Sequence, residues 1–222
     1  MSLVRKVGIF ALATAALLAA RTIRADDLKS VLERLDAAAQ DFHSTSAHVE
    51  FDTIQTYPVP DKDVLTGTAY YERTGNRFQM AAHLTADNNH PVSRTYIFSD
   101  GVLRVSDTGK LSDAKVYNQA GKYESYLMLG FGASGRQLEE KWTIKYLGAE
   151  TINGVATDKL ELLPKDPEVR KTIPKVTIWM DTARAVSLKQ VFDEGEGQSR
   201  VCYYTDIKVN QPLPRGAFSF DK

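Results

Sequence analysis

This 222-residue chain contains very little cysteine and has no formal net charge. Cys202 is its single cysteine, so an internal disulfide is excluded. The 28 Lys and Arg residues balance 28 Asp and Glu residues, and residues 1–25 hold four of the basic residues and no acidic one. The rest of the chain is therefore mildly acidic. Because proteins that bind nucleic acid concentrate Lys and Arg to neutralise phosphates, we expect no nucleic-acid partner.

Motifs of enzymes, metal sites and nucleotide cofactors are missing as well. Residues 132–135 (GASG) lack the G-x-S-x-G spacing of a hydrolase nucleophile, and Ser134 is better explained as a helix cap. The four histidines have no zinc-ligand spacing, and no glycine-rich phosphate loop is present. Cys202 stands beside two tyrosines in a strand-like run, where a packed thiol is expected. We therefore expect no catalytic residues, no metal and no cofactor.

The N-terminus has the layout of a secretory signal peptide. Arg5 and Lys6 precede residues 7–20, which are uncharged and mostly apolar. At ~1.5 Å per residue this run spans roughly 21 Å, less than the ~30 Å hydrocarbon core of a membrane. We predict a signal peptide over residues 1–25, cleaved near Ala25, and a periplasmic domain over 26–222. An uncleaved amphipathic anchor is the alternative, because two arginines lie close to the cleavage site.

The sequence next changes from a helical period to a strand period. From Asp27 to Phe42, apolar residues recur at helical spacing, which predicts an amphipathic helix capped by Asp26 or Asp27. From Ala47 onward apolar and polar residues alternate, and turn residues separate about ten such runs. The chain therefore predicts a series of antiparallel strands. Their apolar phase includes Phe51, Phe78, Met80, Ile178, Met180, Leu188 and Phe192.

Residues 121–141 interrupt this series. Lys122–Leu129 and Ser134–Lys141 favour helix, and Gly130-Phe131-Gly132 joins them. The first of these helices carries four consecutive apolar residues, 126–129, which indicates burial on several sides. With few helices to cover a long sheet, we expect a mainly β (α+β) fold. It consists of a single curved antiparallel sheet with helices at its mouth.

Two interpretations of the apolar residues stay open at this point. The simpler one, on composition alone, is the core of an ordinary β-sandwich. The functional one is a cavity for an apolar ligand, covered by Tyr123–Phe131 as a mobile lid. Gly130, Gly132 and Gly135 would give that lid a permissive backbone at its end.

Several short motifs occur in order along the chain. They are GTAYYER at 67–73, SDG at 99–101, GAETING at 148–154, LELLPK at 160–165 and LPRGAFSF at 213–220. Their order resembles the LolA-type lipoprotein carrier family and its LolA/LolB/RseB relatives over nearly all of residues 27–220. The resemblance implies an open half-barrel of about eleven strands with a helical lid. It also implies that residues 213–220 form a closing strand.

The function implied by the resemblance is that of a periplasmic carrier and not of an enzyme. Such a carrier binds acyl chains of lipoproteins, or another lipid, in a hydrophobic cavity and shuttles them toward the outer membrane. Its implied partners are an inner-membrane lipoprotein-releasing transporter and an outer-membrane acceptor, and we expect a monomer. Arg73 falls where the carriers have a strand arginine that holds the lid. The residues expected to line the cavity are Phe51, Phe78, Met80, Leu127, Leu129, Phe131, Ile178, Met180, Leu188 and Phe192.

Two other functions are compatible with the same sequence. The first is a regulatory binding protein of the RseB kind, which senses lipid in the same cavity and restrains a membrane partner. The second is a periplasmic hydrolase, which the lack of a nucleophile and base constellation disfavours.

Overall fold

The computed structural model describes residues 27–75, 77–118, 121 and 124–221. The expected signal peptide and its cleavage site near Ala25 lie outside the described residues, and so do Asp26 and the lid residues Lys122 and Tyr123. None of the helices within the described ranges has the length and apolar character that crossing a membrane requires.

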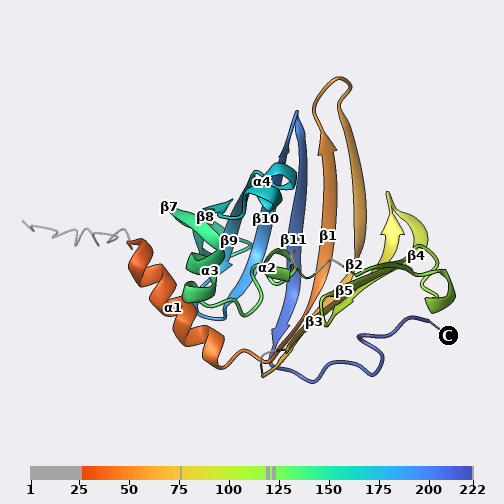
Figure 1. Cartoon of the computed structure of the whole chain (residues 1–222), viewed down its shortest axis with the longest axis horizontal. Coiled ribbons are helices and arrows are strands. Elements are labelled where there is room, and N and C mark those ends of the chain that lie inside the picture. Colours follow the sequence, from red (N-terminus) through yellow and green to blue (C-terminus); the bar gives the residue numbers. More distant parts are fainter. Residues whose placement is uncertain (1–26, 76, 119–120, 122–123, 222) are drawn as a thin grey trace, which may run out of the picture.

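In the part of the chain that the structure describes, eleven strands form one open antiparallel sheet in the order β6-β5-β4-β3-β2-β1-β11-β10-β9-β8-β7 (Figure 1). Their bounds are β1 Ser44–Gln55, β2 Asp61–Thr74, β3 Arg77–Asp87, β4 His90–Ser99, β5 Val102–Ser106, β6 Lys115–Tyr117, β7 Trp142–Ile152, β8 Val155–Pro164, β9 Lys175–Asp181, β10 Val186–Gly195 and β11 Gln198–Val209. Two meanders, β1–β6 and β7–β11, meet where β1 pairs with β11. The predicted mainly β fold with a single sheet of eleven strands is confirmed.

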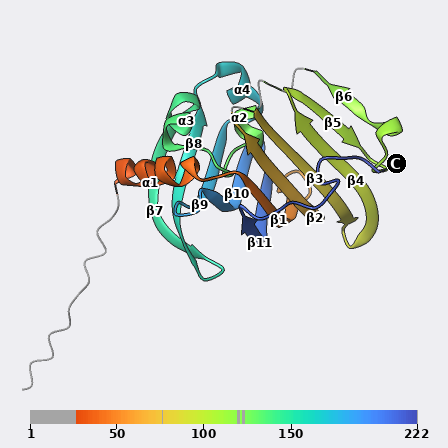
Figure 2. The same ribbon diagram turned by 90° about the horizontal axis from the view of Figure 1, so that it is seen from below.

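The two meanders are joined by one long connection between opposite edges of the sheet. It leaves β6, carries α2 (Glu124–Leu127) and α3 (Gly135–Lys141), and enters β7 (Figure 2). α1 (Leu28–Gln40) and α4 (Pro167–Thr172) pack into the same core cluster as α2 and α3. The four α-helices found in the described ranges therefore cover one face of the sheet, the concave face. A 3-10 turn, η1 (Leu111–Asp113), lies between β5 and β6.

The helix boundaries follow capping chemistry. Asp27 caps α1, where its Oδ1 accepts a hydrogen bond from the Ser30 amide at 2.8 Å. Ser134 caps α3 in a reciprocal capping box with Gln137, as the sequence predicts. α2 is shorter than predicted and ends at Leu127. α4 was not predicted, although Asp166 caps it and Pro167 occupies its first turn, which is a recognisable start signal.

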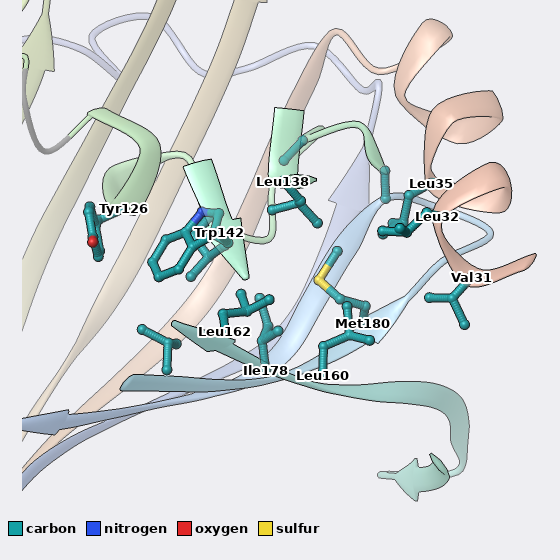
Figure 3. Close-up of a cluster of buried hydrophobic side chains, with 14 of the residues drawn as sticks. Val31, Leu32, Leu35, Tyr126, Leu138, Trp142, Leu160, Leu162, Ile178 and Met180 are labelled. Carbon is teal, nitrogen blue, oxygen red and sulfur yellow. The ribbon is translucent and has the colours of Figure 1, made fainter. Parts of the chain in front are cut away.

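The concave face contains two apolar clusters. The first lies under α1 and α3, where three side chains of α1 face β8 and β9 (Figure 3). Its largest fully buried members include Trp142, whose ring meets Tyr126 edge to face at a centroid distance of 4.6 Å. The second cluster lies over β1–β4 and β11 and surrounds Phe131, which is fully buried. The apolar alternation of the strands therefore faces the helices.

Residues 213–220 do not form the closing strand that the motif resemblance implied. Pro212 and Pro214 lack N–H donors, and a ladder strand needs these donors. The segment instead follows the opposite, convex face as irregular backbone, where His83 Nε2 lies 2.8 Å from the Ala217 carbonyl oxygen. The Asp221 amide donates to Gly109 O at 2.9 Å. β11 is the last strand, and it pairs with β1 and β10.

A polar network fastens α1 to the sheet at the β8–β9 end. Arg34 of α1 forms an ion pair with Asp158 at 2.8 Å, and its Nε donates to Thr182 Oγ1 at 3.1 Å. Asp158 also accepts hydrogen bonds from Tyr146 at 3.1 Å and from Thr182 at 3.0 Å. Its side chain is 10% exposed. The Asp158 carboxylate therefore joins the helix to the sheet.

Asp158→Asn should lower the free energy of unfolding by about 1–2 kcal/mol, because an amide of the same shape cannot accept all of these hydrogen bonds. The measurement is urea denaturation at neutral pH. Glu33→Gln is the matched control, since the Lys29–Glu33 pair on the same helix is 81% and 65% exposed and contributes little. Equal stability of the two variants would contradict a fastening role for Asp158.

Candidate functional site

A pocket of about 360 Å³ opens on the concave face between the sheet, α2 and the end of α4. This volume falls within the range of about 300–1,000 Å³ that is usual for small-molecule sites. Five of the predicted lining residues contribute to it, namely Phe51, Met80, Leu127, Leu129 and Phe192. The wall is completed by Tyr71, Leu103, Tyr126, Thr172, Ile173, Gln190, Arg200, Cys202 and Tyr204.

The other five predicted lining residues do not line this pocket. Phe78 and Phe131 are packed in the second cluster, and Ile178 and Met180 in the first, where the helices cover them. Leu188 is buried at a β-bulge between Ser187 and Lys189 and joins neither cluster. An extra residue in one strand interrupts the alternation of its side chains. The alternation with a period of two therefore identifies which strand residues face the concave side. It does not identify which of them the helices leave uncovered as a pocket wall.

The end of the expected lid is anchored to β10. The Ser187 amide donates to Gly130 O at 2.7 Å, and the Gly132 amide donates to Ala185 O at 2.8 Å. The buried side chain of Gln190 donates from Nε2 to Leu129 O at 2.7 Å. Residues 129–132 are thus bound by a short stretch of antiparallel pairing, and α2 precedes this anchor.

Glycine is required at both turns of the anchor. Gly130 and Gly132 have φ angles of +81° and +70°, which other residues rarely adopt. A Cβ atom on Gly130 would lie 2.5 Å from the Cβ of Ser187, and one on Gly132 would lie 2.2 Å from a ring atom of Phe42. This segment can therefore approach β10 and Phe42 closely only because both turn residues are glycine and have no side chain.

Arg73 connects α1 with the same segment. It lies near the end of β2, and its guanidinium donates to the carbonyl oxygens of Gly132 and of Ala39, the latter at 3.5 Å. The guanidinium carbon also lies 5.8 Å from the centroid of the Phe42 ring. Partial burial lowers the pKa of Arg73 from its ordinary value. Arg73 thus contacts the last turn of α1 and the α2–α3 connection, while its role as a latch stays a prediction.

The inner wall of the pocket carries hydroxyl and thiol groups that stay neutral. Tyr71 and Tyr204 share a side-chain hydrogen bond, and the Phe131 ring stacks on Tyr71 at a centroid distance of 3.8 Å. Burial raises the pKa of both tyrosines well above the ordinary value and raises the pKa of Cys202 from 9.0 to about 12. The Cys202 thiol therefore stays protonated at neutral pH, which is unsuitable for a nucleophile.

The charged part of the pocket lies at its rim. Among the described residues that line the pocket, Arg200 is the one with a charged side chain. Across the ranges that the structure describes, no group of three or more His, Cys, Asp or Glu side chains is arranged to hold a metal ion. The site thus combines an apolar, neutral interior with one cation at its edge.

Sequence reasoning missed several wall residues that carried a signal. Tyr204 follows the same alternation as Cys202, two residues away, and Tyr71 stands in the GTAYYER motif. Gln190 is a polar residue at an apolar-phase position of β10, which indicates a buried hydrogen-bonding task. Thr172 and Ile173 had no such signal, because they reach the pocket only through α4.

The buried thiol generates a prediction about alkaline pH. In the folded state the pKa of Cys202 is raised to about 12, so between 9.0 and about 12 the unfolded chain releases a proton that the folded chain keeps. Stability from this group is therefore present below pH 9 and is lost as pH rises, by about 1.4 kcal/mol per pH unit. Urea denaturation measures how far the free energy of unfolding falls between about pH 8 and about pH 10.5. This fall should be about 2 kcal/mol smaller in Cys202→Ala than in the wild-type protein. An equal fall in both proteins would show that the thiol ionises in the folded state.

The architecture is similar to that of solved structures of low sequence identity. No protein-family model matches the chain, and no curated protein sequence matches it significantly. MucB matches over 88% of this chain and 63% of its own length, with 14% identity and a TM-score of 0.54. MucB in the Pseudomonas aeruginosa MucA/MucB complex matches over 86% and 60%, with 14% identity and a TM-score of 0.51.

An uncharacterized conserved protein from Thermus thermophilus has the same architecture. It matches over 87% of this chain and 94% of its own, with 10% identity and a TM-score of 0.52. At these identities the similarity concerns the fold alone. MucB is an RseB-type protein, and this chain spans about 63% of its length. The chain therefore has the LolA/LolB/RseB-like fold that its sequence motifs resemble.

Proposed function

We propose that this protein is a periplasmic lipid carrier that acts by binding and not by catalysis. The observation that carries the proposal is the pocket on the concave face, which is lined mainly by apolar and aromatic side chains. Burial contributes about 0.8 kcal/mol per methylene group, so an alkyl chain held there gains useful affinity without any covalent chemistry. The finer proposal is that the cargo includes acyl chains of lipoproteins, taken from an inner-membrane transporter and delivered to an outer-membrane acceptor.

α2 is the element proposed to move during loading and release. Its residues Tyr126 and Leu127 contact the pocket, and only Met128 lies between α2 and the anchored segment, which begins at Leu129. The anchor to β10 limits such a movement to the part before residue 129. A lid of one helical turn is small enough to open without breaking the sheet.

Binding of an uncharged apolar probe tests the pocket. Leu127→Glu should weaken binding of the neutral dye N-phenyl-1-naphthylamine by roughly ten-fold or more, because an unpaired carboxylate at an apolar mouth is costly. Leu147→Glu is the control, since Leu147 is 40% exposed on the edge strand β7 and does not line the pocket. A mass spectrum of an organic extract of the purified protein should contain lipid. If both variants bound the dye equally and the extract contained no lipid, the concave face would be an ordinary hydrophobic core and not a binding site.

The fastening of the lid by Arg73 gives a second test. Arg73→Leu removes the donors to Gly132 and Ala39, so amide exchange over 124–132 should accelerate while Val176–Met180 in β9 stays protected. Transfer of labelled lipid between vesicles should change more than the melting temperature does.

The exposed Arg77→Leu on β3 is the control for that test. A large loss of thermal stability in Arg73→Leu, with exchange over 124–132 and transfer both unchanged, would make Arg73 a structural residue and not a latch.

A regulatory binding protein is the second candidate function. It is favoured by the similarity to MucB, which has been solved in a complex with MucA. A carrier should deliver bound lipid to acceptor vesicles, whereas a sensor should bind lipid and retain it. The vesicle assay therefore separates the two functions even when both bind the same lipid.

A further inference from the structure

The position of Arg200 at the rim bears on which lipid the pocket accepts. Arg200 lies on β11 in the same phase as Cys202 and Tyr204, which form the inner wall. In the sheet it stands between Phe192 of β10 and Thr53 of β1. Its aliphatic stem thus runs beside an aromatic pocket wall, and its side chain remains 53% exposed. This is the geometry of an apolar site that ends in one cation.

Arg200 is paired with Glu194, but only through part of its guanidinium. Its Nε donates to Glu194 Oε1 at 2.5 Å, and Nη2 contacts the same oxygen. A guanidinium has five N–H donors, so one carboxylate oxygen leaves others to bind a second acceptor. The pair is partly exposed, at 53% for the Arg200 side chain and 22% for that of Glu194, so solvent screens it and a charged head group can compete for Arg200.

Other charged side chains on β4 and β10 form ion pairs of their own and do not line the pocket. Arg94 contacts Asp87 at 3.8 Å and Asp107 at 3.0 Å. On β10, Asp193 pairs with Lys175 at 3.1 Å. Arg200 is therefore the cation through which the pocket itself can recognise a charged head group.

The size of the pocket limits the apolar part of the ligand. Its volume of about 360 Å³ lies near the lower end of the range of about 300–1,000 Å³ that is usual for small-molecule sites. That capacity suits most of a single alkyl chain.

We propose that the pocket binds a single-chain amphiphile with an anionic head group, whose carboxylate or phosphate binds Arg200 while its alkyl chain lies against Phe51, Met80 and Phe192. This proposal rests on the lipid-binding function proposed above. Glu194 then acts as the internal competitor of the head group, because both use the same guanidinium. Charge-assisted hydrogen bonds to Arg give the anion its preference over a neutral head group of equal chain length.

The test is displacement of N-phenyl-1-naphthylamine by four C16 amphiphiles, namely hexadecanoate, hexadecyl phosphate, hexadecanol and hexadecyltrimethylammonium. Wild-type protein should bind at least one of the two anions roughly ten-fold more tightly than hexadecanol, and the cation most weakly. Arg200→Gln should remove that preference, so that neither anion binds the variant more tightly than hexadecanol does. Glu194→Gln should strengthen anion binding by about three-fold, since it removes the competing carboxylate. The anion that binds more tightly identifies a carboxylate or a phosphate ligand.

The outcomes separate this inference from the proposed function. Hexadecanol and both anions binding equally to wild type, with Arg200→Gln unchanged, would overturn the anionic preference and leave a lipid-binding pocket. Failure of wild type to bind any of the four would overturn the proposed function itself. If Arg200→Gln does not fold, Glu194→Gln decides, because a variant that binds the anions no more tightly than wild type contradicts the proposed competition.

Discussion

The pairing of β1 with β11 is the constraint on which the rest of the structure depends. It joins two meanders at the middle of the sheet and so leaves β6 and β7 at opposite edges. The chain between these edges has to pass across the sheet, and backbone buried there must find hydrogen-bond partners. Two short helices and a stretch of pairing with β10 supply them. The cover of the concave face is thus a consequence of strand order.

The segment between β6 and β7 that covers the concave face is anchored to β10 at one end. The pocket lies beside this anchor. The carbonyls of Leu129 and Gly130 are bound by Gln190 and by the Ser187 amide, and Arg73 binds Gly132. Tyr126 and Leu127 of α2 border the pocket there. The same segment therefore closes one half of the sheet and exposes the other.

The pocket is electrically neutral inside and charged at its rim for a single physical reason. Ionised side chains are costly where water is excluded, so the buried Tyr71, Tyr204 and Cys202 keep their protons. Arg200 can remain charged because about half of its side chain reaches solvent. The proposed preference for an amphiphile follows from this gradient of polarity along β11.

Local signals in the sequence determined most of the elements. The alternation of residues such as Phe51 and Met80 predicted strands with one apolar face, and Ser134 predicted the start of a helix. The motif order led to the correct fold class. These features depend on neighbours in the chain, whose spacing is set by the periods of helix and strand.

Tertiary structure decided which apolar residues line a pocket and which are covered. Phe131 and Leu127 belong to one apolar run, yet Phe131 is stacked on Tyr71 in the core while Leu127 borders the pocket. The difference arises from pairing with β10, whose residues lie more than fifty positions later in the chain. The pairing of residues 129–132 with a strand so distant in the chain leaves no local pattern, so only the folded chain reveals it.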